Sequence, residues 1–199
     1  SNWYNISIAQ NLKSIEQNLV EHFKMIPYWS NHYQVNDKIN SIDSLTAENE
    51  AFEKMLINNI TQYPSTIKYD FKALKDEGLS IAYSKDGLFR IYSWDTWQGG
   101  TMHFFKTIYQ YKVGEKIFSK IIEDTTAEGG NPGAWYSDLY TLNTERRTIY
   151  IGVNHSVYST MDHADAVKLF AIENENLNDT VHLIKTKTGI RNELRYNYD

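Results

Sequence analysis

Cysteine is absent from this 199-residue sequence, which contains only three prolines and no long run of apolar residues. Without cysteine the chain forms no disulfide, no thiolate nucleophile and no cysteine-based metal site, although reducing and oxidising compartments both tolerate such a chain. Because a helix needs about 20 consecutive apolar residues to cross a bilayer, we expect no membrane insertion. The scarcity of proline accompanies an abundance of asparagine, isoleucine, lysine and tyrosine, which is typical of a biased genome composition.

Basic charge is also in short supply. The chain has 20 lysines and arginines against 25 aspartates and glutamates, a net charge of −5, and a pI near 5.7. Phosphate backbones attract clustered lysine and arginine, which here are scattered, so we predict no nucleic-acid partner. The glycine-rich residues 129–133 are not followed by the Lys-Ser/Thr pair of a phosphate loop, and we expect no cofactor.

The balance of 41% hydrophobic and 23% charged residues is typical of a globular chain with its own core. We therefore predict a single domain over residues 1–199. The sequence begins with Ser1 rather than Met, which suggests either that a signal peptide or a lipoprotein leader with its lipid anchor preceded it or that the first residues are the remnant of a tag. On this basis we expect an extracytoplasmic protein, either periplasmic or at the cell surface.

The first 78 residues have the periodicity of helices. Apolar side chains recur at spacings of three and four over residues 8–26, which predicts an amphipathic helix that ends before Pro27. A second helix is expected through residues 45–60. A third, short helix is expected over residues 65–78, with a hydroxyl side chain capping its start.

Residues 79–199 change to the period of two that is typical of strands. Lys85-Asp86-Gly87 is a hairpin signal, and the other expected turns are also short. The prediction is therefore an α+β fold in which about three helices pack on an antiparallel meander of eight or nine strands. This β-rich part could also be a fragment of a longer β protein. The expected strands are 79–83, 88–94, 101–111, 116–123, 136–142, 147–154, 167–174, 180–187 and 191–198.

Three short segments of the β-rich part resemble a known group of proteins. The segments are Tyr92-Ser93-Trp94-Asp95, Gly99-Gly100-Thr101-Met102 with Phe104-Phe105, and Phe170-Ala171-Ile172-Glu173-Asn174. In these segments the sequence is similar to uncharacterised exported bacterial, lipoprotein-like proteins of unknown function. The resemblance implies export and carries over no functional residue.

The segment from Trp94 to His103 contains the strongest candidate binding site. Two indoles beside a carboxylate and an amide can form a platform for a sugar ring or another flat ligand, to which Trp135 and Tyr136 could add. The alternative is that these aromatic residues belong to the core, where large aromatics are more often found. The candidate ligand-binding residues are Trp94, Asp95, Trp97, Gln98, His103, Trp135 and Tyr136.

A second candidate is a metal site at His155, Asp162 and His163. Imidazole and carboxylate groups bind zinc where cysteine is absent, and His103 would complete the set if the strands converge. The alternative is a polar surface loop, because no His-Glu-x-x-His helix is present. The sequence also contains no Gly-x-Ser-x-Gly elbow and no serine with a histidine and an acid at a spacing typical of serine hydrolases.

Three hypotheses of function follow. The first, which we favour, is a non-catalytic exported binding domain for a carbohydrate, a peptide or a cell-envelope partner. The alternative is a hydrolase, metal-assisted or not, in which Asp95, His103, His155 and His163 supply acid, base or ligand groups. The third is an inhibitor or immunity-type protein whose acidic surface blocks a basic partner.

Overall fold

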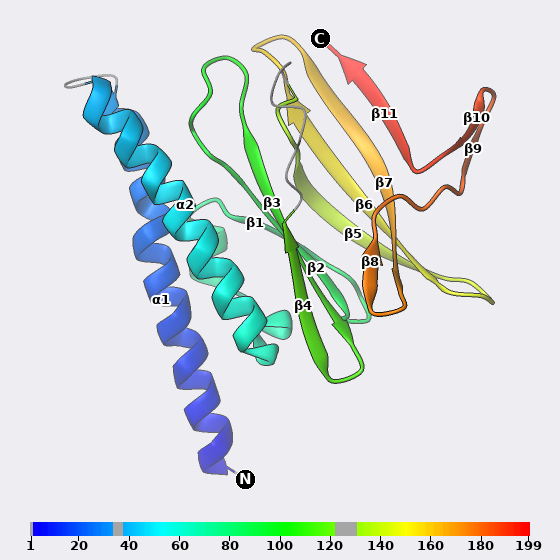
Figure 1. Cartoon of the computed structure of the whole chain (residues 1–199), viewed down its shortest axis with the longest axis horizontal. Coiled ribbons are helices and arrows are strands. Elements are labelled where there is room, and N and C mark those ends of the chain that lie inside the picture. The colour runs from blue at the N-terminus through cyan, green and yellow to red at the C-terminus, as the bar shows by residue number, and fades with distance from the viewer. Residues whose placement is uncertain (1, 34–37, 122–130) are drawn as a thin grey trace.

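The described residues, 2–33, 38–121 and 131–199, form three layers in the computed structural model (Figure 1). Two long helices make the first layer, a four-stranded antiparallel sheet the second, and a five-stranded antiparallel sheet the third. This arrangement confirms the predicted α+β class with its helices at the N-terminus. Within the described residues, no helix has the length and apolar content that a bilayer crossing requires.

Helices α1 (Asn2–Tyr33) and α2 (Lys38–Gln62) lie side by side (Figure 1). The prediction that the first helix ends before Pro27 is wrong, because α1 continues through it for six more residues, to Tyr33. Proline removes one backbone hydrogen bond from a helix, but Trp29 in the added segment packs against the same core as Ile26 and offsets part of that cost. The buried stripe of α1 is the predicted one: Leu12, Ile15, Leu19, Phe23 and Ile26.

The expected third helix is divided in two. A 3-10 helix, η1 (Pro64–Lys68), is followed by a short α-helix, α3 (Lys72–Asp76). Phe71, between them, has a left-handed backbone with φ 49° and a fully buried ring, so burial of this ring interrupts the helical path. The expected hydroxyl cap is absent from η1, since Thr66 donates its hydroxyl to the carbonyl of Tyr63 instead, at 2.6 Å.

The four-stranded sheet is an antiparallel meander in the order β1-β2-β3-β4. The predicted hairpin between β1 and β2 is confirmed, with Gly87 in its turn at φ 70° and Ser84 N–H donating to the Phe89 carbonyl at 2.8 Å. The third strand begins later than residue 101, because the residues before Phe105 form a loop. The strands are β1 (Ser80–Tyr83), β2 (Phe89–Asp95), β3 (Phe105–Val113) and β4 (Lys116–Ile121).

Side chains of β2 alternate between two cores. Tyr92 and Trp94 point to the helices, where the indole meets the Phe52 ring edge-on at 5.2 Å. Phe89 and Ile91 point the other way and pack against the five-stranded sheet. The middle layer is therefore buried on both faces.

The five-stranded sheet has the order β11-β7-β6-β5, with β8 paired to the remainder of β7. A separate hairpin of two short strands, β9 and β10, lies beside it (Figure 1). The bounds are β5 (Trp135–Asn143), β6 (Thr148–Val157), β7 (His163–Glu173), β8 (Asn176–Asn178), β9 (Ile184–Thr186), β10 (Gly189–Arg191) and β11 (Glu193–Tyr198).

A single meander of eight or nine strands is therefore a wrong prediction, since the described residues contain eleven strands in three sheets. The expected turn before residue 180 contains β8, and the expected strand 180–187 is reduced to β9. Val181 lies in a small core on the outer face of the sheet instead of in a ladder. Residues 122–130, in the expected strand 116–123 and the turn after it, lie outside the described residues.

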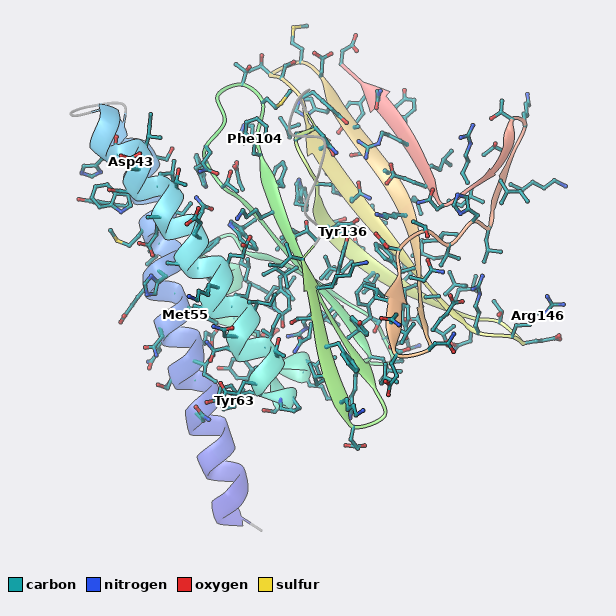
Figure 2. All side chains as sticks on the ribbon, viewed as in Figure 1. Asp43, Met55, Tyr63, Phe104, Tyr136 and Arg146 are labelled. Atoms are coloured by element: carbon teal, nitrogen blue, oxygen red, sulfur yellow. The ribbon has the colours of Figure 1, made fainter. Side chains whose placement is uncertain are left out.

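Tyrosines fill much of the space between the two sheets. Figure 2 shows Tyr136 in this space, where its hydroxyl lies 3.2 Å from that of Tyr109. Burial is the main cause that raises the pKa of both phenols. These two neutral phenols therefore fill only part of the space between the sheets, beside a cavity of about 240 Å³ whose lining includes Lys168, Glu193 and Arg195.

Candidate functional site

The loop of residues 96–104 joins β2 to β3 and shapes the candidate site. Its ends are tied by the Thr96 N–H and hydroxyl, which both donate to the Phe104 carbonyl, at 2.8 and 2.9 Å. Inside the loop, a Cβ on Gly99 would lie only 1.9 Å from the carbonyl oxygen of Met102. Glycine is therefore required at this position for the loop to follow this course.

Helix α2 anchors this loop from the buried side. The side-chain amide of Asn49 donates to the Thr96 carbonyl at 2.9 Å, and its oxygen accepts the indole N–H of Trp94 at 3.1 Å. Nearer the surface, the Gln98 amide donates to the Thr46 hydroxyl at 2.9 Å. These bonds hold the loop in place before any ligand arrives, which lowers the entropy cost of binding.

Trp97 is the exposed aromatic residue of the loop. Its side chain is 46% exposed, and its backbone has a left-handed φ of 56°, which is rare for a bulky residue. The backbone N–H of Trp97 donates to Asp95 Oδ1 at 2.8 Å, which helps to hold this conformation. A strained backbone of this kind costs about 1–3 kcal/mol and is found most often at functional sites.

Asp95 also pairs with His103. The carboxylate Oδ2 lies 2.5 Å from His103 Nδ1, and the imidazole ring stacks on Phe105 at 6.3 Å between centroids. With Nδ1 turned to the carboxylate, Nε2 is the ring nitrogen left to meet a ligand. A carboxylate and an imidazole are thus fixed beside the exposed indole.

Two neighbouring cavities meet at Asp95. The first has a volume of about 260 Å³, and the last turns of α1, beyond Pro27, form one of its walls. The second has a volume of about 410 Å³ and contains Trp135 and Phe105. The first cavity is lined by Ser30, Asn31, Asp95, Trp97, Gly99, Gly100 and His103.

The structure brings four of the seven predicted ligand-binding residues to these cavities as accessible side chains: Asp95, Trp97, His103 and Trp135. Gln98 is exposed nearby. Trp94 borders the larger cavity but is only 1% exposed, and Tyr136 is 4% exposed between the sheets. These last two residues belong to the buried cores of the molecule, and Tyr136 also lines the cavity between the sheets.

The predicted metal-binding residues do not converge. His155 lies between Ser137 and Asp165, with Nε2 2.9 Å from the serine hydroxyl and Nδ1 2.6 Å from the carboxylate. His163 stacks on Tyr198 instead, at 5.7 Å. Asp162 accepts the hydroxyl of Ser159 in a surface turn. Across the described residues there is no group of three or more histidines and acids placed to hold a metal ion.

Sequence reasoning missed Ser137 and grouped Asp165 with His155 only as a neighbour of the metal candidates, whereas the structure places these two residues on either side of His155. The strands expected nearby ended at residue 154 and resumed at 167, so both His155 and Asp165 fell outside them. One signal was available: His163 and Asp165 are two residues apart, the spacing of side chains on one face of a strand. This spacing indicates that the strand expected from residue 167 begins earlier, at His163.

Known proteins offer no guide to this site. No family model, curated protein or solved structure matches this chain. The assignment of a function therefore depends on the geometry and chemistry of the site itself.

Proposed function

We propose that this protein binds a carbohydrate without cleaving it, with sugar rings seated beside Trp97 and Trp135. The observation that carries the proposal is the exposed indole of Trp97, held in a strained backbone conformation next to the Asp95–His103 pair. An aromatic face beside a few fixed polar groups is the usual composition of a small-molecule site.

The polar groups around the indole match the chemistry of a sugar. The apolar face of a sugar ring can lie on an indole, while its hydroxyls both donate and accept hydrogen bonds. The Asp95 carboxylate accepts such bonds, and Ser30 and Asn31, from the end of α1, add a hydroxyl and an amide. Hydroxyls of a sugar in the first cavity can therefore donate to the Asp95 carboxylate and exchange hydrogen bonds with Ser30 and Asn31.

The sizes of the cavities support a ligand of more than one ring. Pockets for small ligands usually measure about 300–1,000 Å³, so the first cavity, at about 260 Å³, is small even for one ligand. The second cavity shares Asp95 with it and has its own indole, that of Trp135. A disaccharide or a short stretch of a longer glycan would place one ring in each.

Binding is favoured over hydrolysis by the number of carboxylates. Glycoside hydrolysis in most enzyme families uses two carboxylates on opposite sides of the bond that breaks. Among the described residues that line the two cavities, Asp95 is the only acid. It is also engaged by Trp97 N–H and by His103.

The test is calorimetric titration of the purified chain with a panel of soluble monosaccharides and oligosaccharides. We expect Trp97→Ala to weaken the binding of a responding saccharide at least tenfold, about 1.4 kcal/mol, while circular dichroism stays unchanged. Trp135→Ala should weaken the binding of oligosaccharides more than the binding of monosaccharides. Tyr140→Ala is the matched control, because Tyr140 is an exposed aromatic on the far sheet, at 58% exposure.

The proposal fails if no saccharide in the panel binds, or if Trp97→Ala and Tyr140→Ala bind equally well. Chromatography of the saccharide after overnight incubation separates binding from cleavage. An intact saccharide agrees with the proposal, and a shortened one contradicts it.

A further inference from the structure

Three neighbouring strands bring a serine, a histidine and an aspartate together on the outer face of the five-stranded sheet. His155 on β6 lies between Ser137 on β5 and Asp165 on β7. The distances are 2.9 Å from His155 Nε2 to the serine Oγ and 2.6 Å from Nδ1 to the Asp165 carboxylate. This is a continuous hydrogen-bonded chain from a hydroxyl to a carboxylate through one imidazole.

Strand register explains how the three residues meet. His155 pairs directly with Asp165 across β6 and β7, and directly paired residues lie on the same face of a sheet. On β5 the register shifts between Tyr136 and Asp138, which makes Ser137 the extra residue of a β-bulge. Bulges re-aim side chains and are common beside active sites, and this one turns Ser137 toward the histidine.

The hydrogen bonds determine the roles of the two ring nitrogens. An ionised carboxylate only accepts hydrogen bonds, so Asp165 selects the form of His155 that carries its proton on Nδ1. Nε2 then has a lone pair directed at the hydroxyl of Ser137. This is the arrangement in which a histidine withdraws a serine proton, and it is recognised by geometry rather than by position in the sequence.

The imidazole is also held in position by its neighbours. The indole of Trp135 stacks on it with centroids 4.4 Å apart and planes inclined by 27°. On the far side of the pair, the hydroxyl of Tyr198 donates to Asp165 Oδ1 at 3.4 Å. A ring fixed on one face by an indole and at one nitrogen by a carboxylate keeps the alignment that proton transfer requires.

Reagents in solution can reach this group. The side chain of His155 is 26% exposed and that of Asp165 is 47% exposed, and Ser137 is half-buried. Ser156, one residue further along β6, points into the sandwich and donates its hydroxyl to the Gly133 carbonyl. Ser137 therefore combines access with a basic partner.

We propose that Ser137 is a nucleophile that takes the acyl group of an activated ester, with His155 as its general base and Asp165 as the positioning residue. As the serine Oγ bonds to the acyl carbon, its proton passes to His155 Nε2. The bond from that carbon to the leaving oxygen breaks, and this oxygen keeps the electron pair and receives the proton from the imidazolium. Water then gives a proton to the same imidazole as its oxygen bonds to the acyl carbon, the bond from that carbon to Ser137 Oγ breaks, and Oγ takes the proton from the imidazolium, which releases the acid and restores the hydroxyl.

A fluorophosphonate probe tests this step directly, because serine attack on its phosphorus expels fluoride and leaves a stable adduct. We expect peptide mass mapping of the labelled full chain to locate the adduct on Ser137 and to find none in Ser137→Ala. His155→Gln should slow labelling about 100-fold, the scale of general base catalysis. Asp165→Asn should slow it at least tenfold. The release of p-nitrophenolate from p-nitrophenyl acetate should follow the same order.

Ser159→Ala is the matched control, because Ser159 is half-buried like Ser137 and is bonded to a carboxylate with no histidine between them. Circular dichroism of each variant separates lost reactivity from lost folding. Absence of an adduct on Ser137, or equal labelling rates in the wild type and His155→Gln, would overturn the proposal. Neither Ser137 nor His155 lines the carbohydrate cavities, and the labelling is measured without saccharide, although Trp135 both lines the second cavity and stacks on His155.

Discussion

The two large sheets are built from the same kind of alternating strand but differ in what covers them. The four-stranded sheet is buried on both faces, between the helices and the second sheet. The five-stranded sheet is buried on its inner face, whereas its outer face, within the described residues, is covered only by the small core around Val181 and displays Tyr140, Leu142, Leu194 and Tyr196, all more than half exposed. Alternation alone therefore does not reveal whether a strand's second face is core or surface, which is decided by the layers that pack on it.

The largest expected contrast between the sheets is in the cost of removing an aromatic side chain. Trp94→Ala, in the doubly covered sheet, should lower the free energy of unfolding by about 3–5 kcal/mol, because it leaves a cavity and removes the donor to Asn49 Oδ1. Tyr196→Ala, on the open face at 70% exposure, should change it by less than about 0.5 kcal/mol. Urea unfolding measures both. An equal loss of unfolding free energy in the two variants would contradict the contrast between the covered and the open sheet.

A second contrast lies between the packed interior and the exposed loop. A Cβ at Gly152 would lie 2.9 Å from the Tyr136 ring and 3.0 Å from the Phe170 ring. We expect Gly152→Ala to cost about 1–3 kcal/mol through overpacking of the space between the sheets. Gly100→Ala meets nothing within 4 Å and should leave the urea midpoint almost unchanged. If Gly152→Ala leaves the urea midpoint unchanged, the two sheets can move apart enough to admit the added methyl group, which would contradict the prediction.

The smallest expected effect concerns alkaline pH. Burial and the hydrogen bond to Glu16 raise the pKa of Tyr69 to about 12. Its folded pKa exceeds the unfolded value of about 10, so its contribution to stability is complete below pH 10 and is lost as pH rises from about 10 to about 12. In Tyr69→Phe the free energy of unfolding should fall less steeply with pH over this range. The difference in slope should be at most that produced by the release of about one proton on unfolding.

Urea midpoints at several values between pH 9 and 12 measure that slope. Tyr140→Phe, on the open face of the second sheet, is the control and should keep the wild-type slope. A Tyr69→Phe slope as steep as that of the control would show that Tyr69 contributes nothing to the alkaline loss.

Local features of the fold were predictable from the sequence. The spacing of Leu12, Ile15 and Leu19 determines the buried face of α1, and the turn at Gly87 follows from the residues that favour it. The association of Asp95, Trp97 and His103 was also predictable, because all three lie within nine residues, from the last residue of β2 into the loop that follows it. In each case the signal lies within a short stretch of chain.

Features that depend on contacts distant in sequence were not predictable. Whether Trp94 faces ligand or core depends on helix α2, about 40 residues earlier, where Asn49 accepts its indole N–H. The meeting of Ser137 with His155 depends on a bulge that shifts the register by one residue, and no periodic pattern announces such a shift. The passage of α1 through Pro27 likewise depends on what Trp29 packs against.

The two walls of the first cavity, the end of α1 and the loop of residues 96–104, are held by different numbers of hydrogen bonds. Because Pro27 has no N–H, the carbonyl of Phe23 lacks its usual partner one turn later, and the turns that carry Ser30 and Asn31 are joined to the rest of α1 by one bond fewer. The facing loop, tied to Asn49 and closed between Thr96 and Phe104, is held on several sides. We therefore expect a ligand that needs more room to displace the end of α1, which contacts the loop through the 3.5 Å bond from the Ser30 hydroxyl to the Trp97 carbonyl, rather than the loop itself.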